Sequence, residues 1–245
     1  MSSIRTAVHL HTDWSYDGSL TLNQLAEGLA RRNYRAALMT EHDRGFDQSR
    51  WTDYQAACKE ASRTDLLLVP GIEYSDPENR VHVLVWGEQI EFLGEGLETL
   101  DLLREVSARN GVAIMAHPWR RGAWERFTPE WAEHLVGVEL WNRKSDGFAP
   151  SEQGAELLDR YGLWPVASLD LHRPRQFFPL SMQLEVADCD SGNLISAMRD
   201  GKGTAEVMGI SLDKLRSGVP RATLTCVERL RKAVAPAVRK VIGRG

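Results

Sequence analysis

The stretch Thr6-Ala7-Val8-His9-Leu10-His11 decides the fold that we expect for this chain. Its apolar residues predict a strand over residues 6–10, and side chains of an extended chain alternate between two faces with a period of two. His9 and His11 therefore point the same way at the end of this strand, where two imidazoles can share one metal ion. The pair alone is weak evidence, because such pairs also arise by chance. The rest of the chain has to supply matching ligands.

Size and composition are those of a globular protein with one large domain or two small ones, at 245 residues and 42% apolar content. No segment resembles a signal peptide, and no apolar run approaches the ~20 residues needed to span a bilayer. The three cysteines, Cys58, Cys189 and Cys226, form no Cys-x-x-Cys motif. This pattern argues against a disulfide framework and favours a cytoplasmic location. Any metal must then be held by histidine and carboxylate side chains.

Charge is distributed unevenly along the chain. Residues 210–245 carry nine Lys/Arg and two Asp/Glu, a net charge of +7, which leaves 21 basic and 32 acidic residues, a net charge of −11, in residues 1–209. An acidic body disfavours nucleic acid as a partner and suits a carboxylate site that needs cations. In the tail, apolar residues recur at helical spacing among the basic ones: Val227, Leu230, Val234, Val238 and Val241. We expect a domain over 1–209 and a basic, partly helical tail that contacts an anionic surface or partner.

Short apolar segments alternate with segments of helical spacing along the whole body. Strands are predicted at 6–10, 36–39, 66–69, 81–86, 112–115, 136–141, 165–168 and 181–186. Helices are predicted at 21–32, 51–62, 97–109, 129–134, 151–161 and 191–200. This alternation is typical of parallel βαβ units, and therefore of an α/β sheet or barrel. In such folds the functional site forms at the C-terminal ends of the strands.

Six of the seven histidines and three carboxylates close, follow or lie within these predicted strands. They are His9, His11, Asp17, His42, Glu73, His82, His117, Asp170 and His172. Neutral imidazole and carboxylate are ligands for Zn²⁺, Mn²⁺ and Fe²⁺. Nine such groups exceed the needs of one ion, so we expect two or three divalent ions. Clustered ions lower the pKa of a bridging water towards ~7 and clamp the attacking and leaving oxygens of a phosphoryl or acyl centre.

The order of these motifs carries a family resemblance over about residues 5–208. The motifs are His-x-His with Asp17, then Glu41-His42-Asp43, Gly71-Ile72-Glu73, His82 within a strand, Ala116-His117-Pro118, and Asp170-x-His172. The chain in this respect resembles the PHP (polymerase and histidinol phosphatase) family. The resemblance implies a distorted (β/α)7 barrel with a trinuclear metal site at the C-terminal ends of the strands.

The resemblance also implies a role for each ligand position. It assigns one ion to His9, His11, Glu73 and Asp170, a second to Glu73, His82 and His117, and a third to Asp17, His42 and His172. It implies that a hydroxide shared between ions attacks phosphorus in line with the ester oxygen. One departure from the family pattern is Ser168-Leu169 before Asp170, where many relatives have Gly-Ser. This change affects the wall beside the metals, and so bears on the substrate.

Candidates beyond the ligands are fewer. Arg120 follows the Ala-His-Pro motif by two residues, where phosphatases of the family often place a phosphate contact, and Arg173 directly follows the last ligand. Arginine is suited to bidentate recognition of phosphate, so both are substrate-binding candidates. Asp43 could orient His42 or protonate the leaving group. Together with the bridging Glu73, Asp43 is our catalytic candidate.

These observations predict a metal-dependent phosphoesterase that acts on a small phosphomonoester. Three alternatives stay open. One is a phosphodiesterase or exonuclease acting on nucleotides or short oligonucleotides. Another is an amidohydrolase-type C–N hydrolase, a class that typically adds a carboxylated lysine at a strand end, whereas no lysine closes a predicted strand here. The last is a non-catalytic, metal-stabilised module, although such modules usually lose ligands and this chain retains all nine positions.

Overall fold

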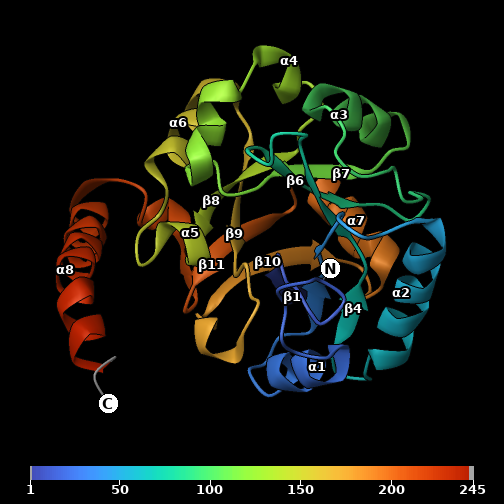
Figure 1. The fold of residues 1–245 in the computed structure, drawn as a ribbon, viewed down its shortest axis with the longest axis horizontal. Helices are drawn as coiled ribbons and strands as arrows, with labels where there is room; N and C mark the ends of the chain where they lie inside the picture. The colour runs from blue at the N-terminus through green and yellow to red at the C-terminus, as the bar shows by residue number, and fades with distance from the viewer. Residues whose placement is uncertain (1, 243–245) are drawn as a thin grey trace.

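The computed structural model describes the backbone of residues 2–242 and the side chains up to residue 234. The fold is mixed α/β, with two six-stranded sheets surrounded by helices (Figure 1). The first sheet has the order β12 (Ile210–Ser211), β11 (Gly203–Val207), β10 (Leu180–Val186), β1 (Ser2–Val8), β2 (Ala36–Leu38) and β4 (Leu67–Val69). The second has the order β3 (Glu41–His42), β5 (Ile72–Ser75), β6 (His82–Trp86), β7 (Val112–Met115), β8 (Gly137–Asn142) and β9 (Trp164–Ser168).

Two chain segments pass directly from the first sheet to the second. One segment runs from β2 into β3, and the other runs from β4 into β5. The two segments lie side by side, because β2 pairs with β4 in the first sheet and β3 pairs with β5 in the second, both in parallel. On the opposite side, the backbone N–H of Leu169 donates to Val8 O at 3.0 Å, and that of His11 donates to Leu171 O at 3.0 Å. The chain that follows β9 is therefore hydrogen-bonded to the chain that follows β1. The two sheets are thus joined by the continuous chain at the β2–β3 and β4–β5 connections, and by backbone hydrogen bonds next to β1 and β9.

The expectation of uniformly parallel strands is wrong at two places. β6 runs antiparallel to both β5 and β7, because the turn over 76–81 is too short for a crossover helix and forms a hairpin instead. β10 runs antiparallel to β1, since only the short turn η2 (Pro174–Gln176) lies in the segment that joins β9 to β10. Four strands, β3, β5, β11 and β12, were not expected from the sequence, and the last two form a further antiparallel hairpin beside β10.

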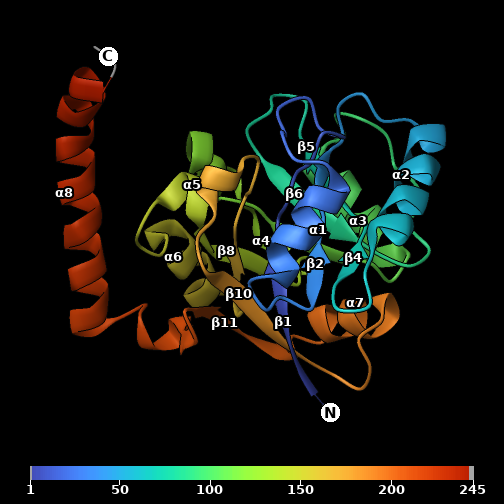
Figure 2. The same ribbon diagram turned by 90° about the horizontal axis from the view of Figure 1, so that it is seen from below.

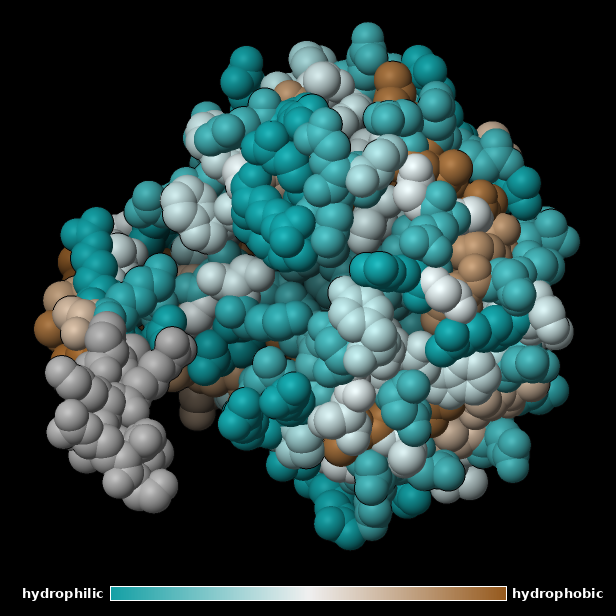
Figure 3. All heavy atoms as spheres, viewed as in Figure 1, coloured by the Kyte–Doolittle hydropathy of each residue, from teal (hydrophilic) through white to brown (hydrophobic). Residues whose placement is uncertain are grey.

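The six helices predicted before residue 210 are present, α5 is an additional short helix that was not predicted, and the helices surround the sheets (Figures 1 and 2). They are α1 (Leu22–Ala30), α2 (Gln48–Ala61), α3 (Thr99–Ala108), α4 (Pro129–Ala132), α5 (Arg143–Asp146), α6 (Glu152–Tyr161) and α7 (Ser191–Arg199), with the 3-10 turns η1 (Arg120–Arg126) and η3 (Leu212–Lys214). The start of α1 follows from a capping box, in which Thr21 and Gln24 satisfy each other's backbone N–H groups. The space-filling view shows that one face is hollowed near its centre, where hydrophilic residues gather (Figure 3).

After β12 and η3, most of the tail forms one long helix, α8 (Gly218–Ile242), which stands at the side of the body (Figure 2). Its inner face is held by Glu228, whose Oε2 accepts from Phe148 N at 3.0 Å. The opposite face exposes Val219, Val227, Leu230 and Val234, whereas the side chains of Val238 and Val241 lie outside the described ones. No helix in the described part of the chain is long and apolar enough to cross a membrane. The division between a domain over 1–209 and a tail over 210–245 stays a prediction.

The passage from β4 to β5 depends on a glycine. A Cβ on Gly71 would lie 2.3 Å from Cδ1 of Trp86 and 2.6 Å from Met39 O. Trp86 cannot easily move aside, because it is buried and its Nε1 donates to Met39 O at 2.8 Å. Close approach of these three residues therefore fixes the bend that carries the strand from one sheet to the other.

We expect Gly71→Ala to lower the free energy of unfolding by about 1–3 kcal/mol, as overpacking of a filled core does. Urea denaturation measures this loss. Gly28→Ala is the matched control, since Gly28 lies inside α1 with its nearest neighbouring atom, Arg32 Nη1, 3.7 Å from the added Cβ. Alanine there should raise stability by about 0.5–1 kcal/mol. Equal effects of the two substitutions would contradict the proposed close approach.

Candidate metal centre

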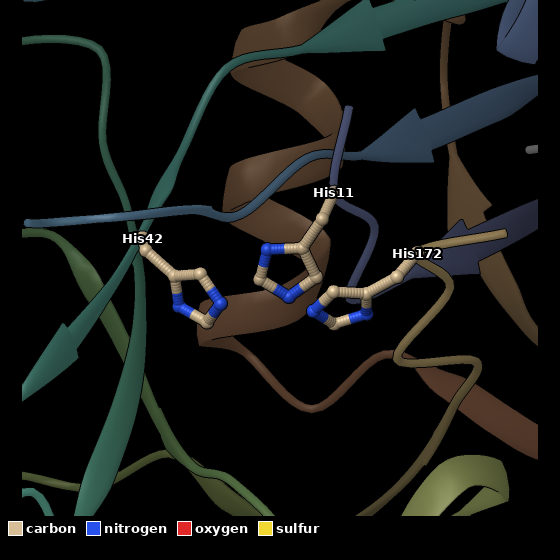
Figure 4. A group of neighbouring side chains, drawn as sticks. All are labelled: His11, His42 and His172. Carbon is tan, nitrogen blue, oxygen red and sulfur yellow. The ribbon is translucent and has the colours of Figure 1, made fainter. Parts of the chain in front are cut away.

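All nine ligand candidates lie together at one end of the strands. Three groups of their ligand atoms each fall within 4.8 Å of one another: His11 with His42 and His172, His9 with His11 and Asp170, and His9 with Glu73 and His117. In the first group the ring of His11 lies between the other two, with centroid separations of 4.4 Å to His42 and 4.0 Å to His172 (Figure 4). Residues from distant parts of the chain therefore converge on one buried site.

Glu73 lies at the middle of the cluster and is 1% exposed. Its Oε2 atom faces three imidazoles. It lies 3.3 Å from Nε2 of His9, 3.3 Å from Nε2 of His11 and 3.1 Å from Nδ1 of His42. The first two histidines follow β1 and the third ends β3, so this single oxygen is approached from both sheets.

The other oxygen of Glu73, Oε1, faces a different pair of imidazoles. It lies 2.6 Å from Nδ1 of His82 and 2.9 Å from Nε2 of His117. The reversed direction of β6 explains this contact, because it brings the first residue of β6, His82, to the edge where β5 ends. Arg120 approaches from outside, with Nη1 2.9 Å from Nε2 of His82. The two oxygens of one carboxylate thus address two separate sets of imidazoles.

Asp17 and Asp170 complete the cluster on the side of His172. Asp17 places Oδ1 3.3 Å from Nε2 of His42 and Oδ2 3.1 Å from Nε2 of His172. Asp170 places Oδ1 3.2 Å from Nδ1 of His172. The same oxygen lies 3.9 Å from Nε2 of both His9 and His11. The three groups of residues that the family resemblance assigned to three ions are therefore adjacent. Asp170 of the first group contacts His172 of the third.

Several buried nitrogens in the cluster make no hydrogen bond with the described residues, even where a carboxylate oxygen lies 3.3 Å away. They include Nε2 of His9, His11 and His42 and Nδ1 of His117. A buried polar atom without a partner costs about 1–3 kcal/mol. Lone pairs of this kind, next to three carboxylates, form a donor set that fits Zn²⁺, Mn²⁺ or Fe²⁺. The residues present therefore fit a divalent metal.

The pKa shifts point to the same need for positive charge. Burial disfavours the charged form of Glu73, but His9, His82 and His42 outweigh it and hold the pKa of this carboxylate well below its usual value. Burial likewise disfavours protonated His42, yet Glu73 and Asp17 raise its pKa to about 10. His11 behaves oppositely, because burial and nearby His42 place its pKa well below 6.5. The carboxylates thus favour neighbouring cations strongly enough to protonate buried imidazoles.

Three of the candidate ligands adopt backbone conformations that are rare for residues other than glycine. His9, His117 and Asp170 have φ angles of 64°, 25° and 47°. Such left-handed conformations cost on the order of 1–3 kcal/mol each and persist only where the surrounding structure holds them in place. They cluster at functional sites, and here all three fall on the same site.

Two predicted residues lie outside the ligand contacts. Asp43 is buried, but its Oδ2 accepts from the backbone N–H groups of Ser75 at 3.1 Å and Gly96 at 3.4 Å. Burial raises the pKa of Asp43 to about 6. Arg173 is exposed and begins the turn η2. Asp43 therefore joins the end of β5 to the loop at Gly96, and the roles of Asp43 and Arg173 in catalysis or substrate binding stay predictions.

Sequence reasoning missed two buried carboxylates, Glu139 and Glu41. Glu139 hydrogen-bonds to the ring of His9. Glu41 accepts from Thr12 N at 3.0 Å, Thr12 Oγ1 at 2.5 Å and Ser15 Oγ at 2.5 Å, and so fixes the loop that leads to Asp17. One signal was available, since Glu139 stands inside an otherwise apolar predicted strand, where a charge needs a buried partner.

Lys144 was also missed. It lies in α5, two residues past the end of β8, and its Nζ is 3.3 Å from Oδ1 of Asp170 and 3.1 Å from Nε2 of His172. A lysine amine therefore does reach the site, although no lysine closes a predicted strand. Tyr16 was missed as well. Its ring is 69% exposed and stacks on His42 with a centroid separation of 5.0 Å.

Comparison with known proteins supports the fold. No protein-family model and no curated protein matches the sequence. Among solved structures, PsfC from Pseudomonas syringae is similar with a TM-score of 0.64 and 13% identity, over 96% of this chain and 100% of that one. A two-domain protein from Bacteroides vulgatus that contains a predicted PHP-like metal-dependent phosphoesterase gives a TM-score of 0.62 at 16% identity, over 88% of this chain and 68% of that one.

The lesion-specific endonuclease EndoQ from Pyrococcus furiosus is also similar, with a TM-score of 0.58 and 14% identity, over 84% of this chain and 58% of that one. At these identities the likeness is one of fold. The resemblance to the PHP family, which the sequence motifs predicted, is thereby confirmed at the level of the fold.

We expect divalent transition metals to stabilise the protein. Binding at 100 times the dissociation constant adds about 2.7 kcal/mol, which corresponds to a rise in Tm of about 5–10 °C for a domain of this size. Thermal unfolding of the metal-stripped protein with added Zn²⁺ or Mn²⁺ measures the rise, and Ca²⁺ is the control because it prefers oxygen ligands. Absence of a rise with either metal, together with only trace metal by elemental analysis, would exclude a metal centre.

Proposed function

We propose that this chain is a metal-dependent phosphoesterase that holds two to three divalent ions and hydrolyses a small phosphomonoester. The position of Glu73 carries the proposal, because its Oε2 faces His9, His11 and His42 while its Oε1 faces His82 and His117. A carboxylate that serves two sets of imidazoles is suited to bridge two ions. A separate group, Asp17 with His42 and His172, is suited to a further ion.

The proposal includes a distorted seven-stranded barrel made from the two sheets. Its seven strand positions would be β1, β2 with β3, β4 with β5, β6, β7, β8 and β9, where two consecutive strands named together count as one position. The backbone hydrogen bonds that join residues 169–171 to residues 8–11 support closure of the barrel between β9 and β1. The likeness in fold to a protein with a PHP-like metal-dependent phosphoesterase supports the same reading.

Bound divalent ions would supply Lewis acidity and a water of lowered pKa. The chain's own cations would bind the phosphate. Arg120 stands next to His82, and Lys144 stands next to Asp170 and His172, so that guanidinium and ammonium groups flank different parts of the cluster. Guanidinium groups bind phosphate oxygens through paired hydrogen bonds, whereas lysine acts as a point charge.

The remaining candidates have supporting roles in the proposal. Asp43 would orient its neighbour His42 by tying the backbone of Ser75 and Gly96, in preference to protonating the leaving group. Arg173, being exposed, would contact the part of a substrate that extends beyond the ligands. A cytoplasmic location fits the three cysteines, which the structure leaves as free thiols.

A phosphodiesterase acting on oligonucleotides is the second candidate. Two observations favour it. EndoQ, which shares this fold, has been solved with a 27-mer duplex substrate that carries an abasic lesion at the active site. In addition, α8 exposes basic side chains such as Arg229 and Lys232, which could follow a nucleic-acid backbone or another anionic partner. The C–N hydrolase alternative gains one feature, the amine of Lys144 at the site.

We expect Glu73→Gln to lower kcat by at least about 100-fold, since loss of a ligand exceeds the 10–100-fold cost of losing an outer-shell partner. The substitution keeps the shape and removes the charge. Release of inorganic phosphate from a panel of metabolites with Mn²⁺ or Zn²⁺ measures the effect, and circular dichroism checks the fold. Unaltered activity in a folded variant would refute the bridging role.

The same panel, extended to bis(p-nitrophenyl) phosphate and short oligonucleotides, separates the two candidate functions. A phosphomonoesterase releases inorganic phosphate from monoesters and leaves the diesters intact. Cleavage of diesters alone would favour the phosphodiesterase. Hydrolysis of neither class by the metal-loaded wild-type protein would favour the non-catalytic module.

We expect Arg120→Ala to raise KM for phosphate esters about tenfold or more without changing the metal content, because a hydrogen bond between charged groups contributes about 1.5–3 kcal/mol. Arg121→Ala is the matched control. Arg121 is adjacent and exposed, and its Nη1 donates to Asn79 O at 2.8 Å instead of approaching a histidine. If both variants have the same KM as the wild type, Arg120 belongs to the surface and not to the substrate site.

A further inference from the structure

Glu139 lies in the middle of β8 and is completely buried beside the metal centre. Its Oε1 lies 2.7 Å from Nδ1 of His9, at a distance of 130 residues along the chain. Its Oε2 accepts from the backbone N–H of His117 at 2.6 Å and from Nδ2 of Asn142 at 2.8 Å. Both oxygens are thus used by groups of the protein, which leaves Glu139 outside the set of candidate ligands.

Two of the three hydrogen-bond partners of Glu139 are candidate ligands with left-handed backbones. It contacts His9 and His117 directly. Its neighbour Asn142 extends the contact to the third such ligand candidate, since the same Nδ2 atom lies 3.2 Å from Oδ2 of Asp170. Each of these conformations is strained and needs surrounding structure to hold it. One buried carboxylate and one amide therefore reach all three strained ligand candidates.

We propose that Glu139 and Asn142 are positioning residues that hold His9, His117 and Asp170 in the conformations that bind metal. This inference rests on the proposed metal-dependent function. With Nδ1 of His9 donating to Glu139, the lone pair of the ring remains on Nε2, which is buried without a partner and lies 3.3 Å from Glu73 Oε2. A carboxylate behind a histidine ligand fixes the tautomer and the ring orientation in this way.

The pattern of donors explains why a carboxylate is required. The backbone N–H of His117 can only donate, and so can Nδ2 of Asn142, so Oε2 must accept from both. Oε1 accepts from His9. A glutamine at position 139 has a single acceptor oxygen, so its NH2 group would face one of these donors. Glu139→Gln therefore changes the hydrogen bonding of the ligands while keeping the volume of the core.

Glu41 provides a matched control. It is equally buried, with 0% exposure, but two of its three partners are the hydroxyl groups of Thr12 and Ser15. Hydroxyl groups can rotate to accept from a glutamine NH2, and Glu41 contacts no candidate ligand through its own oxygens. Glu41→Gln thus replaces a second buried glutamate by its isosteric amide without disturbing the three strained residues.

The test is a titration of the metal-stripped full chain with Zn²⁺ in competition with a chromophoric chelator. We expect Glu139→Gln to weaken about 10–100-fold the ions assigned to His9, His117 and Asp170. The ion assigned to Asp17, His42 and His172 should keep its wild-type affinity, because Glu139 contacts none of these residues. Glu41→Gln should lower Tm but leave unchanged the affinity of the ion assigned to His82 and His117, because Glu41 reaches candidate ligands only through Ser15, which contacts His11 and the backbone N–H of His42. A general loss of stability would instead weaken every site in both variants.

Asn142→Ala provides a second route if Glu139→Gln does not fold. It leaves the bond from Glu139 to His9 and should weaken only the ion that includes Asp170. Wild-type affinities in Glu139→Gln and Asn142→Ala, or equal losses at every site, would overturn the inference while leaving the metal centre intact. Failure of the wild-type protein to bind Zn²⁺ would overturn the proposed function and this inference together. Because the readout is metal affinity, neither result depends on knowing the substrate.

Discussion

The buried carboxylate of Glu73 is the interaction on which the site depends. An ionised carboxylate removed from water loses several kcal/mol of solvation, and only close positive charge or hydrogen-bond donors offset this loss. Here the compensating groups are imidazoles that follow β1, end β3, begin β6 and follow β7. Glu73 therefore joins both sheets electrostatically, and the strand ends must meet at one place for this charge to be buried at all.

The backbone is arranged to satisfy that requirement. β6 is reversed, so that its first residue, and not its last, reaches the cluster. The bend at Gly71 lets the chain pass from β4 in the first sheet to β5 in the second, and so places Glu73 next to the histidines that follow β1. The left-handed conformations of His9 and Asp170 turn each chain sharply just after its strand. Regular secondary structure brings the segments close, and these departures from regular geometry aim the side chains.

The clustering of the candidate ligands could be predicted from the sequence because each follows or begins a short apolar segment, and strand ends meet in an α/β fold. The same reasoning failed where partners are distant in sequence. Glu139 looked like one polar residue in an apolar strand, and its meaning depends on His9, 130 residues away. The directions of β6 and β10 depend on the lengths of the connections that precede them. The alternation of predicted strands and helices does not take these lengths into account. β11 was missed because Gly203-Thr204-Ala205-Glu206-Val207 has few strongly apolar residues.

Charge balance links the supporting residues to substrate choice. Asp17, Glu73, Glu139 and Asp170 place four carboxylates at the site, and the pKa values of all four lie below their usual range, so all are ionised at neutral pH. Arg120 and Lys144 supply two positive charges at its edge. Without divalent cations, a phosphate ester approaching this acidic body meets mostly negative charge. In the proposed function, two or three divalent cations would reverse the local sign, and Arg120 and Lys144 would add to the field that attracts anions. Under the proposed function, substrate binding and metal binding are therefore coupled electrostatically, because an anionic ester would bind only once the cations have changed the sign of the site.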